Sequence, residues 1–218
     1  MKSFLVIGMG RFGRAVALEL YRMKYEVQAV DMSEDKIAPY MGQVTNAIIG
    51  DTTDAAVLRS LGVDNFDCVI IGIGEAIENS IWTLMILKEL GAKMIICKAR
   101  DERHAKIMSQ LGADKVIRPE NDMGIRVAHT LAHKNVMDFH DISTDHSVIE
   151  IVVPSKWAGK SIAQNNLRKK HRITVVYIKS SAAGTMDYSP GPETMLYGGD
   201  IITIIGKKKD IEAIHGLD

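Results

Sequence analysis

The chain has 218 residues, enough for one large domain or for a medium domain with a smaller one attached. Hydrophobic residues make up 46% of it and charged residues 25%, which is typical of a soluble globular protein. Basic and acidic residues balance at 27 each, so the net charge provides no attraction to nucleic acid or anionic lipid. No apolar stretch approaches the roughly 20 residues of a membrane-spanning helix. We therefore expect a cytoplasmic protein that does not bind nucleic acid.

Short apolar runs alternate with amphipathic segments through the first half of the chain. Six runs have the length and composition of strands: Phe4–Ile7, Val27–Val30, Ala47–Ile49, Cys68–Gly72, Met94–Cys97 and Lys115–Ile117. The segments between them have helical periodicity: Arg11–Met23, Glu34–Gly42, Asp54–Leu61, Ile77–Leu90 and Glu102–Leu111. Strands separated by helices of this length predict βαβ units and a parallel sheet covered on both faces. We expect an α/β fold, a Rossmann-type doubly wound sheet.

A glycine-rich loop, GMGRFG, follows the first predicted strand and opens the first predicted helix. In this pattern Gly8 permits a tight turn, Gly10 lets backbone amides approach a phosphate, and Gly13 lets helix and strand pack closely. The second strand ends at Asp31, whose carboxylate can accept both ribose hydroxyls and would repel a 2′-phosphate. The combination predicts a dinucleotide or adenine-nucleotide site, and it favours NAD or an adenine nucleotide over NADP.

Other candidate ligand contacts follow the ends of the predicted strands, where a parallel sheet places its crevice. They are Met9, Arg11, Phe12, Met32, Asp51, Thr52, Gly72, Ile73, Gly74, Glu75, Lys98 and Arg100. Asp51 is alternatively a helix cap, and Lys98 and Arg100 are alternatively solvated charges at the rim. Arg11 and Arg14 oppose the dipole of the helix that they begin unless an anion is present. We expect Arg11 to point toward a neighbouring molecule.

The second half of the chain has a different pattern. A helix is predicted from Asn121 to Met137, followed by the polar linker HDISTDHS. Strands are then predicted at Val148–Val153, Ile173–Ile178, around Met186 and at Ile201–Ile205, with a short helix at Ser161–Arg168. Glycine and proline in SPGPE and YGGD indicate hairpin-rich α+β structure. We expect a nucleotide-binding domain over residues 1–122, a crossover helix and linker over 123–145, and a small α+β domain over 146–218.

Three further features have both a structural and a functional interpretation. Cys68 and Cys97 lie in apolar runs and are expected to be buried, reduced thiols. The segment Ile81–Leu90 is apolar around more than one helical face, so it is either buried under the sheet's cover or packed against another subunit. His129 and His133 have metal-ligand spacing but no evident third ligand, which favours a solvent-facing or interface pair.

The motifs GMGRFG with Asp31, GDTTD, VIIGIGE, KARD and IRPENDMG together resemble those of one family. The chain is similar to the cytoplasmic regulatory subunits of Trk/Ktr-type bacterial potassium uptake systems, which join an RCK-N (TrkA-N) domain to a smaller RCK-C (TrkA-C) domain. The resemblance implies binding of ATP, ADP and often NAD(H). It also implies a homodimer that assembles into an octameric ring, peripheral at the inner face of the cell membrane beneath an integral-membrane potassium transporter.

The resemblance also implies roles for single residues. Gly8, Gly10 and Gly13 match the loop, Asp31 the ribose carboxylate and Asp51 the adenine contact. Two further matches concern charges: Arg11 with an arginine that reaches the γ-phosphate held by the neighbouring subunit, and Glu120 with a carboxylate that helps to hold Mg²⁺ or Ca²⁺. Glu120 is alternatively a helix N-terminal residue.

The C-terminal part resembles domains that bind cyclic di-AMP at a dimer interface. Arg168 matches an arginine of that site, and Ile162 and Ile178 would be its apolar lining. An exposed arginine at a helix end is the alternative interpretation of Arg168. Arg14 departs from relatives that have a small residue there.

A change of shape driven by a ligand requires a contact that one ligand makes and another does not. ATP offers Arg11 a third phosphate that ADP lacks. We therefore expect a sensor and not an enzyme. The alternative is an NAD-dependent oxidoreductase, which needs a general acid or base and a substrate domain. None of the seven histidines is predicted at a strand end facing the crevice. A redox-sensing transcription factor would need a basic recognition helix, which the sequence does not show.

Overall fold

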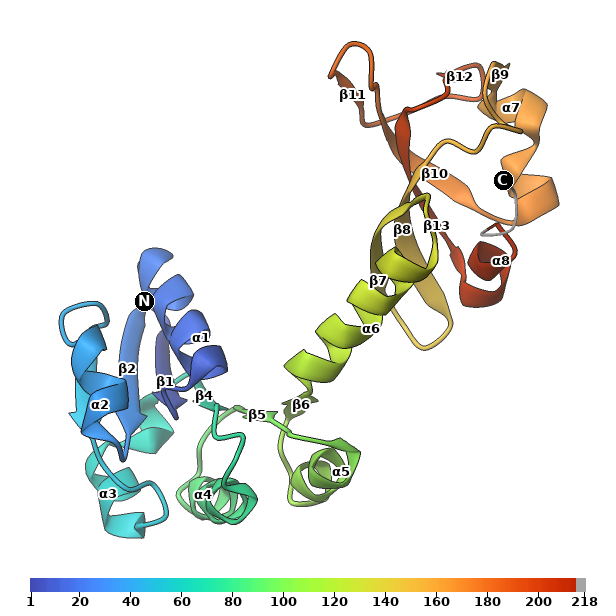
Figure 1. The fold of residues 1–218 in the computed structure, drawn as a ribbon. Helices are drawn as coiled ribbons and strands as arrows, with labels where there is room; N and C mark the ends of the chain where they lie inside the picture. Colours follow the sequence, from blue (N-terminus) through green and yellow to red (C-terminus); the bar gives the residue numbers. More distant parts are fainter. Residues whose placement is uncertain (215–218) are drawn as a thin grey trace. The chain divides into compact units, whose positions relative to one another are not determined.

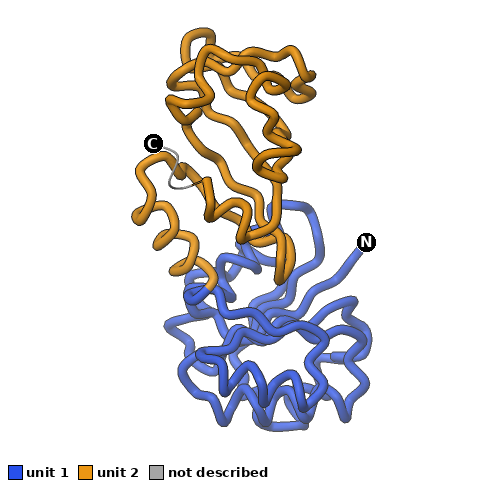
Figure 2. Tube along the Cα trace, turned by 90° about the vertical axis from the view of Figure 1, so that its right-hand side faces the viewer, with its two compact units in different colours: residues 1–121 blue, residues 122–218 orange. Residues whose placement is uncertain are grey.

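The structure is a computed structural model that describes residues 1–214. The chain divides into two compact units, residues 1–121 and residues 122–218 (Figure 2). Each unit has its own sheet and its own buried core.

Unit 1 is built on a six-stranded parallel sheet (Figure 1). Its strands are β1 (Ser3–Ile7), β2 (Glu26–Asp31), β3 (Asn46–Ile49), β4 (Cys68–Ile71), β5 (Ile95–Lys98) and β6 (Lys115–Ile117). They lie in the order β3-β2-β1-β4-β5-β6, and every neighbouring pair is parallel. This is the strand order of a doubly wound dinucleotide-binding fold, which confirms the predicted fold class.

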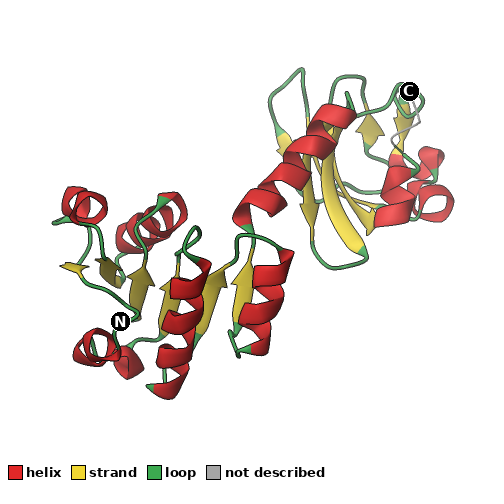
Figure 3. Cartoon of the chain, turned by 60° about the horizontal axis from the view of Figure 1, so that its bottom comes forward, coloured by secondary structure: helices red, strands yellow, loops and turns green. Residues whose placement is uncertain are grey.

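Helices cover both faces of this sheet (Figure 3). They are α1 (Arg11–Arg22), α2 (Glu34–Ile37), α3 (Ala55–Ser60), α4 (Ile77–Glu89) and α5 (Glu102–Gln110), with short 3₁₀ turns η1 (Ala38–Tyr40) and η2 (Val63–Asn65). On one face α1 and α2 bury Ala17 and Ile37 against the sheet. On the other face α3, α4 and α5 bury Leu58, Leu84 and Met108. The reversal of strand order between β1 and β4 therefore leaves a crevice between the two helical layers at the carboxyl ends of the strands.

Unit 2 is a small α+β unit, as the sequence predicted, and its strands pair in antiparallel fashion. Its elements are α6 (Pro119–Ala132, whose first three residues belong to unit 1), β7 (Val136–Asp141), β8 (His146–Val152), β9 (Lys160–Ser161), α7 (Ile162–Asn165), the π-helical turn η3 (Leu167–His171), β10 (Thr174–Lys179), β11 (Met186–Asp187), β12 (Met195–Leu196), β13 (Ile201–Lys207) and α8 (Lys208–Glu212). The five-stranded sheet has the order β11-β10-β13-β8-β7, and β9 pairs with β12. Ile149, Ile151, Ile202 and Ile204 on the central strands form the core with Trp157.

The segment expected to be a helix ending at Met137 and then a linker is different in the structure. Helix α6 already ends at Ala132, and residues 136–141 form β7, which pairs with β8. A bulge between Val136 and Asp138 breaks the alternation that identifies a strand, and the charged Asp138 made the segment look solvent-exposed. The Asp138 carboxylate is in fact paired with Arg126 of α6 through two hydrogen bonds, of 2.6 and 2.5 Å.

Both cysteines are buried free thiols, as predicted. Cys68 on β4 is 5% exposed and Cys97 on β5 is fully enclosed. Burial raises the pKa of Cys68 to about 11 and that of Cys97 to about 12, so neither forms a thiolate at neutral pH. Within residues 1–214, no helix is both long and apolar enough to cross a membrane.

Candidate functional site

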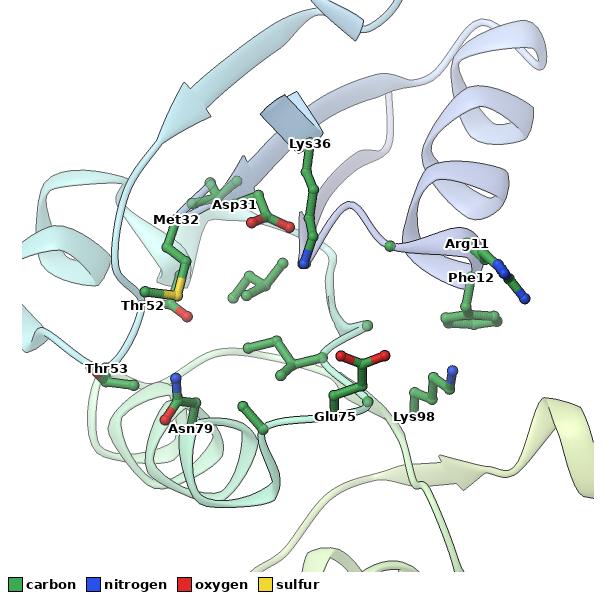
Figure 4. Close-up of a pocket in the computed structure, with 18 of the residues that line it drawn as sticks. Arg11, Phe12, Asp31, Met32, Lys36, Thr52, Thr53, Glu75, Asn79 and Lys98 are labelled. Carbon is green, nitrogen blue, oxygen red and sulfur yellow. The ribbon is translucent and has the colours of Figure 1, made fainter. Parts of the chain in front are cut away.

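Unit 1 contains a cavity of about 740 Å³ at the carboxyl ends of its parallel strands (Figure 4). The loops after β1, β2, β3, β4 and β5 all contribute to its wall, together with the start of α6. Its lining residues are Ile7, Gly8, Gly10, Arg11, Phe12, Val30, Asp31, Met32, Lys36, Gly50, Asp51, Thr52, Thr53, Gly72, Ile73, Gly74, Glu75, Ala76, Asn79, Lys98, Arg100 and Glu120. Most of the residues that the sequence indicated are therefore brought together around one cavity.

The three glycines of the loop have three different steric environments. Gly8 has a φ of +89°, a left-handed conformation that L side chains rarely adopt. A Cβ on Gly13 would lie 1.9 Å from the carbonyl oxygen of Gly8, so α1 can pack on β1 only with glycine at this position. A Cβ on Gly10 would meet no atom within 4 Å. The packing of the protein therefore explains Gly8 and Gly13, whereas Gly10 borders free space in the cavity.

The start of α1 leaves backbone donors available beside this space. Gly10 is the N-cap of the 12-residue helix, and no side chain caps it. No acidic residue lies in the first turn. The unpaired N–H groups and the positive end of the helix dipole together favour an anion at this position.

Asp31 is held in place by two backbone donors. It is 7% exposed, and its two oxygens accept hydrogen bonds from the N–H of Met9 at 2.7 Å and of Ser33 at 2.9 Å. Each carboxylate oxygen can accept a second bond, so Asp31 connects the glycine loop to β2 and can still accept hydroxyl groups. The Met9 side chain, a predicted ligand contact, is 2% exposed and lies in the core. Neither Met9 nor Gly13 lines the cavity.

Hydrogen bonds in the loop after β3 distinguish the two interpretations of Asp51, a ligand contact or a helix cap. The cap of α3 is Asp54, whose side chain accepts the N–H of Ala56 at 2.8 Å. Asp51 instead lies on the cavity wall and accepts the N–H and the hydroxyl of Thr53, at 2.9 and 2.7 Å. Its carboxylate is thereby held at the rim of the cavity without a role in capping the helix.

Charged side chains from α1, β5 and α6 also line the cavity. Lys98 and Glu120 form an ion pair with an Nζ–Oε1 distance of 2.5 Å, and this ammonium holds the pKa of Glu120 below its usual value. Gly74 leaves room for the lysine, because a Cβ there would lie 3.2 Å from Nζ. Arg11 is exposed and, within the part of the chain that the structure describes, forms no ion pair. Arg11 also lines the cavity, so its guanidinium lies at the rim with no ion-pair partner among residues 1–214.

Sequence reasoning missed several residues of the wall. Lys36 extends from α2 into the cavity, and Asn79 comes from the first turns of α4 (Figure 4). The others are Ile7, Val30, Gly50, Thr53 and Ala76. Most of these directly adjoin a predicted contact in the sequence. Lys36 had no such signal, because an exposed lysine on a short helix looks like ordinary solvated surface.

Other candidate residues lie outside the cavity. Arg14 does not line it, and its guanidinium contacts the hydroxyl of Tyr40 at 3.4 Å. The His129 ring stacks on Phe139 at a centroid distance of 3.9 Å. Among residues 1–214 no group of three or more His, Cys, Asp or Glu side chains is arranged to hold a metal ion. Of the seven histidines, His215 lies outside the described residues.

The three residues expected to contact cyclic di-AMP lie in unit 2. Ile178 on β10 is 5% exposed and belongs to the core, and Ile162 packs against the same core. Arg168 is the exposed member of the three.

Two family models match the sequence, the TrkA-N domain over residues 4–119 and the TrkA-C domain over residues 148–217. The chain is 42% identical to Ktr system potassium uptake protein C of Bacillus subtilis over 96% of this chain and 94% of that protein. It is 37% identical to Ktr system potassium uptake protein A of Vibrio alginolyticus, over 94% and 92% of the two chains.

Solved structures agree on the fold. The GsuK RCK domain aligns with a TM-score of 0.67 at 19% identity, over 99% of this chain and 47% of that chain. The GsuK channel bound to NAD aligns with the same TM-score and identity, over 99% and 39%. At this identity the likeness shows the fold alone. The family matches and the nearly full-length identity together show that the chain belongs to the Ktr system potassium uptake proteins built from a TrkA-N and a TrkA-C domain.

Proposed function

We propose that this protein is a nucleotide-sensing regulatory subunit of a potassium uptake system. It binds ATP and ADP, or NAD(H), in the cavity of unit 1 and transmits a change of shape to a membrane subunit that conducts potassium. The observation that carries this proposal is the free space at Gly10 beside the uncapped start of α1. Membership of the Ktr family supplies the transport role.

The lining residues have the chemistry that an adenine nucleotide needs. The backbone N–H groups at Gly10 and the start of α1 take the phosphates. Asp31 accepts the ribose hydroxyls and Asp51 the adenine amino group. Lys98 and Arg100 add positive charge on the other wall. The same set suits NAD(H), since both ligands share the adenosine and the first phosphates.

Discrimination between ATP and ADP comes from Arg11. Its guanidinium is at the rim and exposed, so it is free to contact the γ-phosphate of a nucleotide bound to a neighbouring subunit. A hydrogen bond to a charged group stabilises by roughly 1.5–3 kcal/mol. Because ADP lacks this phosphate, the contact forms only when ATP is bound. ATP therefore favours the conformation in which Arg11 reaches the γ-phosphate, and ADP does not.

A divalent cation such as Mg²⁺ or Ca²⁺ fits this site only together with the nucleotide. Glu120 is the candidate ligand, but its carboxylate is paired with Lys98 at 2.5 Å. Phosphate oxygens would bind the ammonium and supply further cation ligands, which frees Glu120 to bind the metal.

Apolar side chains on the surface support assembly into a homodimer and then an octameric ring. In unit 1 the outer side of α4 exposes 57% of Trp82. In unit 2 the apolar residues of α6 are also exposed: Met123, Ile125, Val127 and Leu131. Apolar patches of this kind mark interaction surfaces. The ring would lie at the inner face of the membrane, held there by its transporter partner.

A thermal-shift titration with ATP, ADP, NAD, NADH and cyclic di-AMP tests the proposal. A ligand that binds only the folded state stabilises it by RT ln(1 + [L]/Kd) and so raises the melting temperature. We expect shifts with the adenine nucleotides that are lost on substituting Asp31→Ala. Absence of a shift with all of them would overturn the proposal. Turnover of NADH with a panel of ketoacids would instead indicate an oxidoreductase.

A further inference from the structure

His104 is a buried histidine next to the cavity wall that the proposed binding site does not use. It lies in the first turn of α5, is 1% exposed and does not line the cavity. The loop before α5 is short, and it carries Arg100 onto the wall directly after β5. The imidazole therefore adjoins a cationic residue of the site without reaching the site itself.

Both nitrogens of this imidazole have partners. Nδ1 accepts the backbone N–H of Arg100 at 3.2 Å, and Nε2 lies 3.0 Å from the hydroxyl of Ser80. The Ser80 hydroxyl in turn donates to the carbonyl of Ile77 at 2.7 Å. With Nδ1 as acceptor, the ring is neutral and carries its proton on Nε2, which then donates to Ser80. Burial also lowers the pKa of His104, which favours this neutral form.

These bonds form one series that links the β5–α5 loop to the first turn of α4, and its central bond, between His104 and Ser80, is buried. It runs from the backbone of Arg100 through His104 and Ser80 to the first residue of α4, Ile77. Ser80 is fully buried, so water does not compete for its hydroxyl. On α4, Asn79 also lines the cavity one residue before Ser80. This series of hydrogen bonds therefore fixes the spacing between the β5–α5 loop and the start of α4.

A simpler role for His104 is to cap α5. Its own backbone N–H donates to the side chain of the N-cap residue Asp101 at 2.9 Å, and its ring accepts the backbone N–H of Arg100, the residue before that cap. That arrangement resembles a capping box and would stabilise the helix. It does not account for the bond from Nε2 to another helix. A capping role alone predicts an effect on stability and none on the ligand contacts of Arg100.

We infer that His104 is a positioning residue for the nucleotide site: it holds the backbone of Arg100 and, through Ser80, ties it to α4, so that the side chain of Arg100 starts from a fixed position on the cavity wall. This inference rests on the proposed function. His104 acts through Arg100 and makes no ligand contact itself. Its removal therefore weakens phosphate binding only while Arg100 has its side chain.

A double-mutant cycle on the full-length chain tests the inference, with ATP binding measured by calorimetry. His104→Leu, which removes both hydrogen bonds, is expected to weaken ATP binding about three- to tenfold. Arg100→Ala is expected to weaken it by at least as much. In the double variant the His104 substitution is expected to add less than about twofold, because coupled residues are not additive. Losses that multiply, or no loss in His104→Leu, would overturn the inference.

Two further variants separate positioning from a loss of stability. Met108→Val removes buried volume from α5 one turn beyond His104, and it should lower stability without changing ATP affinity. His104→Asn can return an acceptor to the Arg100 N–H and should recover most of the affinity lost in His104→Leu. A Met108 variant that binds as weakly as His104→Leu would contradict positioning. If the wild-type protein itself bound no ATP, ADP or NADH, the proposed function would fail first.

Discussion

The steric difference between Gly10 and Gly13 provides a direct test of what the glycine loop is for. A methyl group at Gly13 would lie 1.9 Å from the carbonyl oxygen of Gly8, whereas one at Gly10 would meet nothing within 4 Å. Gly10 also has a φ of −67°, which alanine adopts without strain. Gly13→Ala should therefore damage the fold, and Gly10→Ala should damage only the binding site.

The magnitudes follow from these contacts. In Gly10→Ala, the reduced freedom of the unfolded chain stabilises by roughly 0.4–1 kcal/mol, and alanine is a poorer N-cap by a similar amount. The free energy of unfolding should then change by less than about 1 kcal/mol. In Gly13→Ala the backbone of β1 and α1 must separate, a clash that costs about 3 kcal/mol or more.

Urea denaturation and calorimetric titration with ATP measure the two effects separately. Gly10→Ala is expected to unfold at the wild-type urea concentration but to bind ATP at least about tenfold more weakly, since its methyl group occupies the space for the phosphate. Gly13→Ala is expected to unfold at much lower urea. A Gly10→Ala protein with wild-type ATP affinity would refute the assignment of this space to a phosphate.

Three other predictions concern the stability and reactivity of the fold. The thiols of Cys68 and Cys97, with pKa values of about 11 and about 12, should react with a thiol reagent at pH 8 only after denaturation; fast labelling of the native protein would contradict their burial. Arg126 holds the pKa of Asp138 below its unfolded value, so their pair stabilises unit 2 above about pH 4 and loses this contribution as the pH falls further. Asp138→Asn should therefore lower the melting temperature at pH 7 but not near pH 2, and an equal loss at both would contradict this. Thr83→Val leaves the buried hydroxyl of Thr52, in the loop after β3, without its partner, so the free energy of unfolding measured in urea should fall by about 1–3 kcal/mol. A variant as stable as the wild type would contradict the importance of that hydrogen bond.

The sequence predicted unit 1 well because its parallel strands are buried on both faces. Such strands read as continuous apolar runs, and β4 (Cys68–Ile71) is buried at every position. The loop motifs identified most of the cavity wall for a similar reason: all strand ends of a parallel sheet meet at one edge. The predicted helix Glu34–Gly42 was the least accurate in this unit, since Pro39 divides it into α2 and a 3₁₀ turn.

What the sequence did not predict depends on pairings between distant residues. Strand β7 (Val136–Asp141) was predicted as the end of a helix followed by a polar linker, because the pairing of Asp138 with Arg126 is not visible in the sequence. His104 looked like one histidine among several in helical segments, because neither the Arg100 backbone nor Ser80 marks it as a partner in the sequence. The Lys98–Glu120 pair joins the end of β5 to the start of α6, and no local sequence pattern indicates it.

The central claim is that Arg11 distinguishes ATP from ADP, and the ratio of their dissociation constants tests it most directly. The ratio is measured by calorimetry for the wild-type protein, for Arg11→Ala and for the control Arg14→Ala, whose guanidinium contacts Tyr40 and not the cavity. We expect Arg11→Ala to bind ADP nearly normally and to lose a preference for ATP of about ten- to a hundredfold, while Arg14→Ala keeps it. An Arg11→Ala protein that prefers ATP as strongly as the wild type would contradict the account.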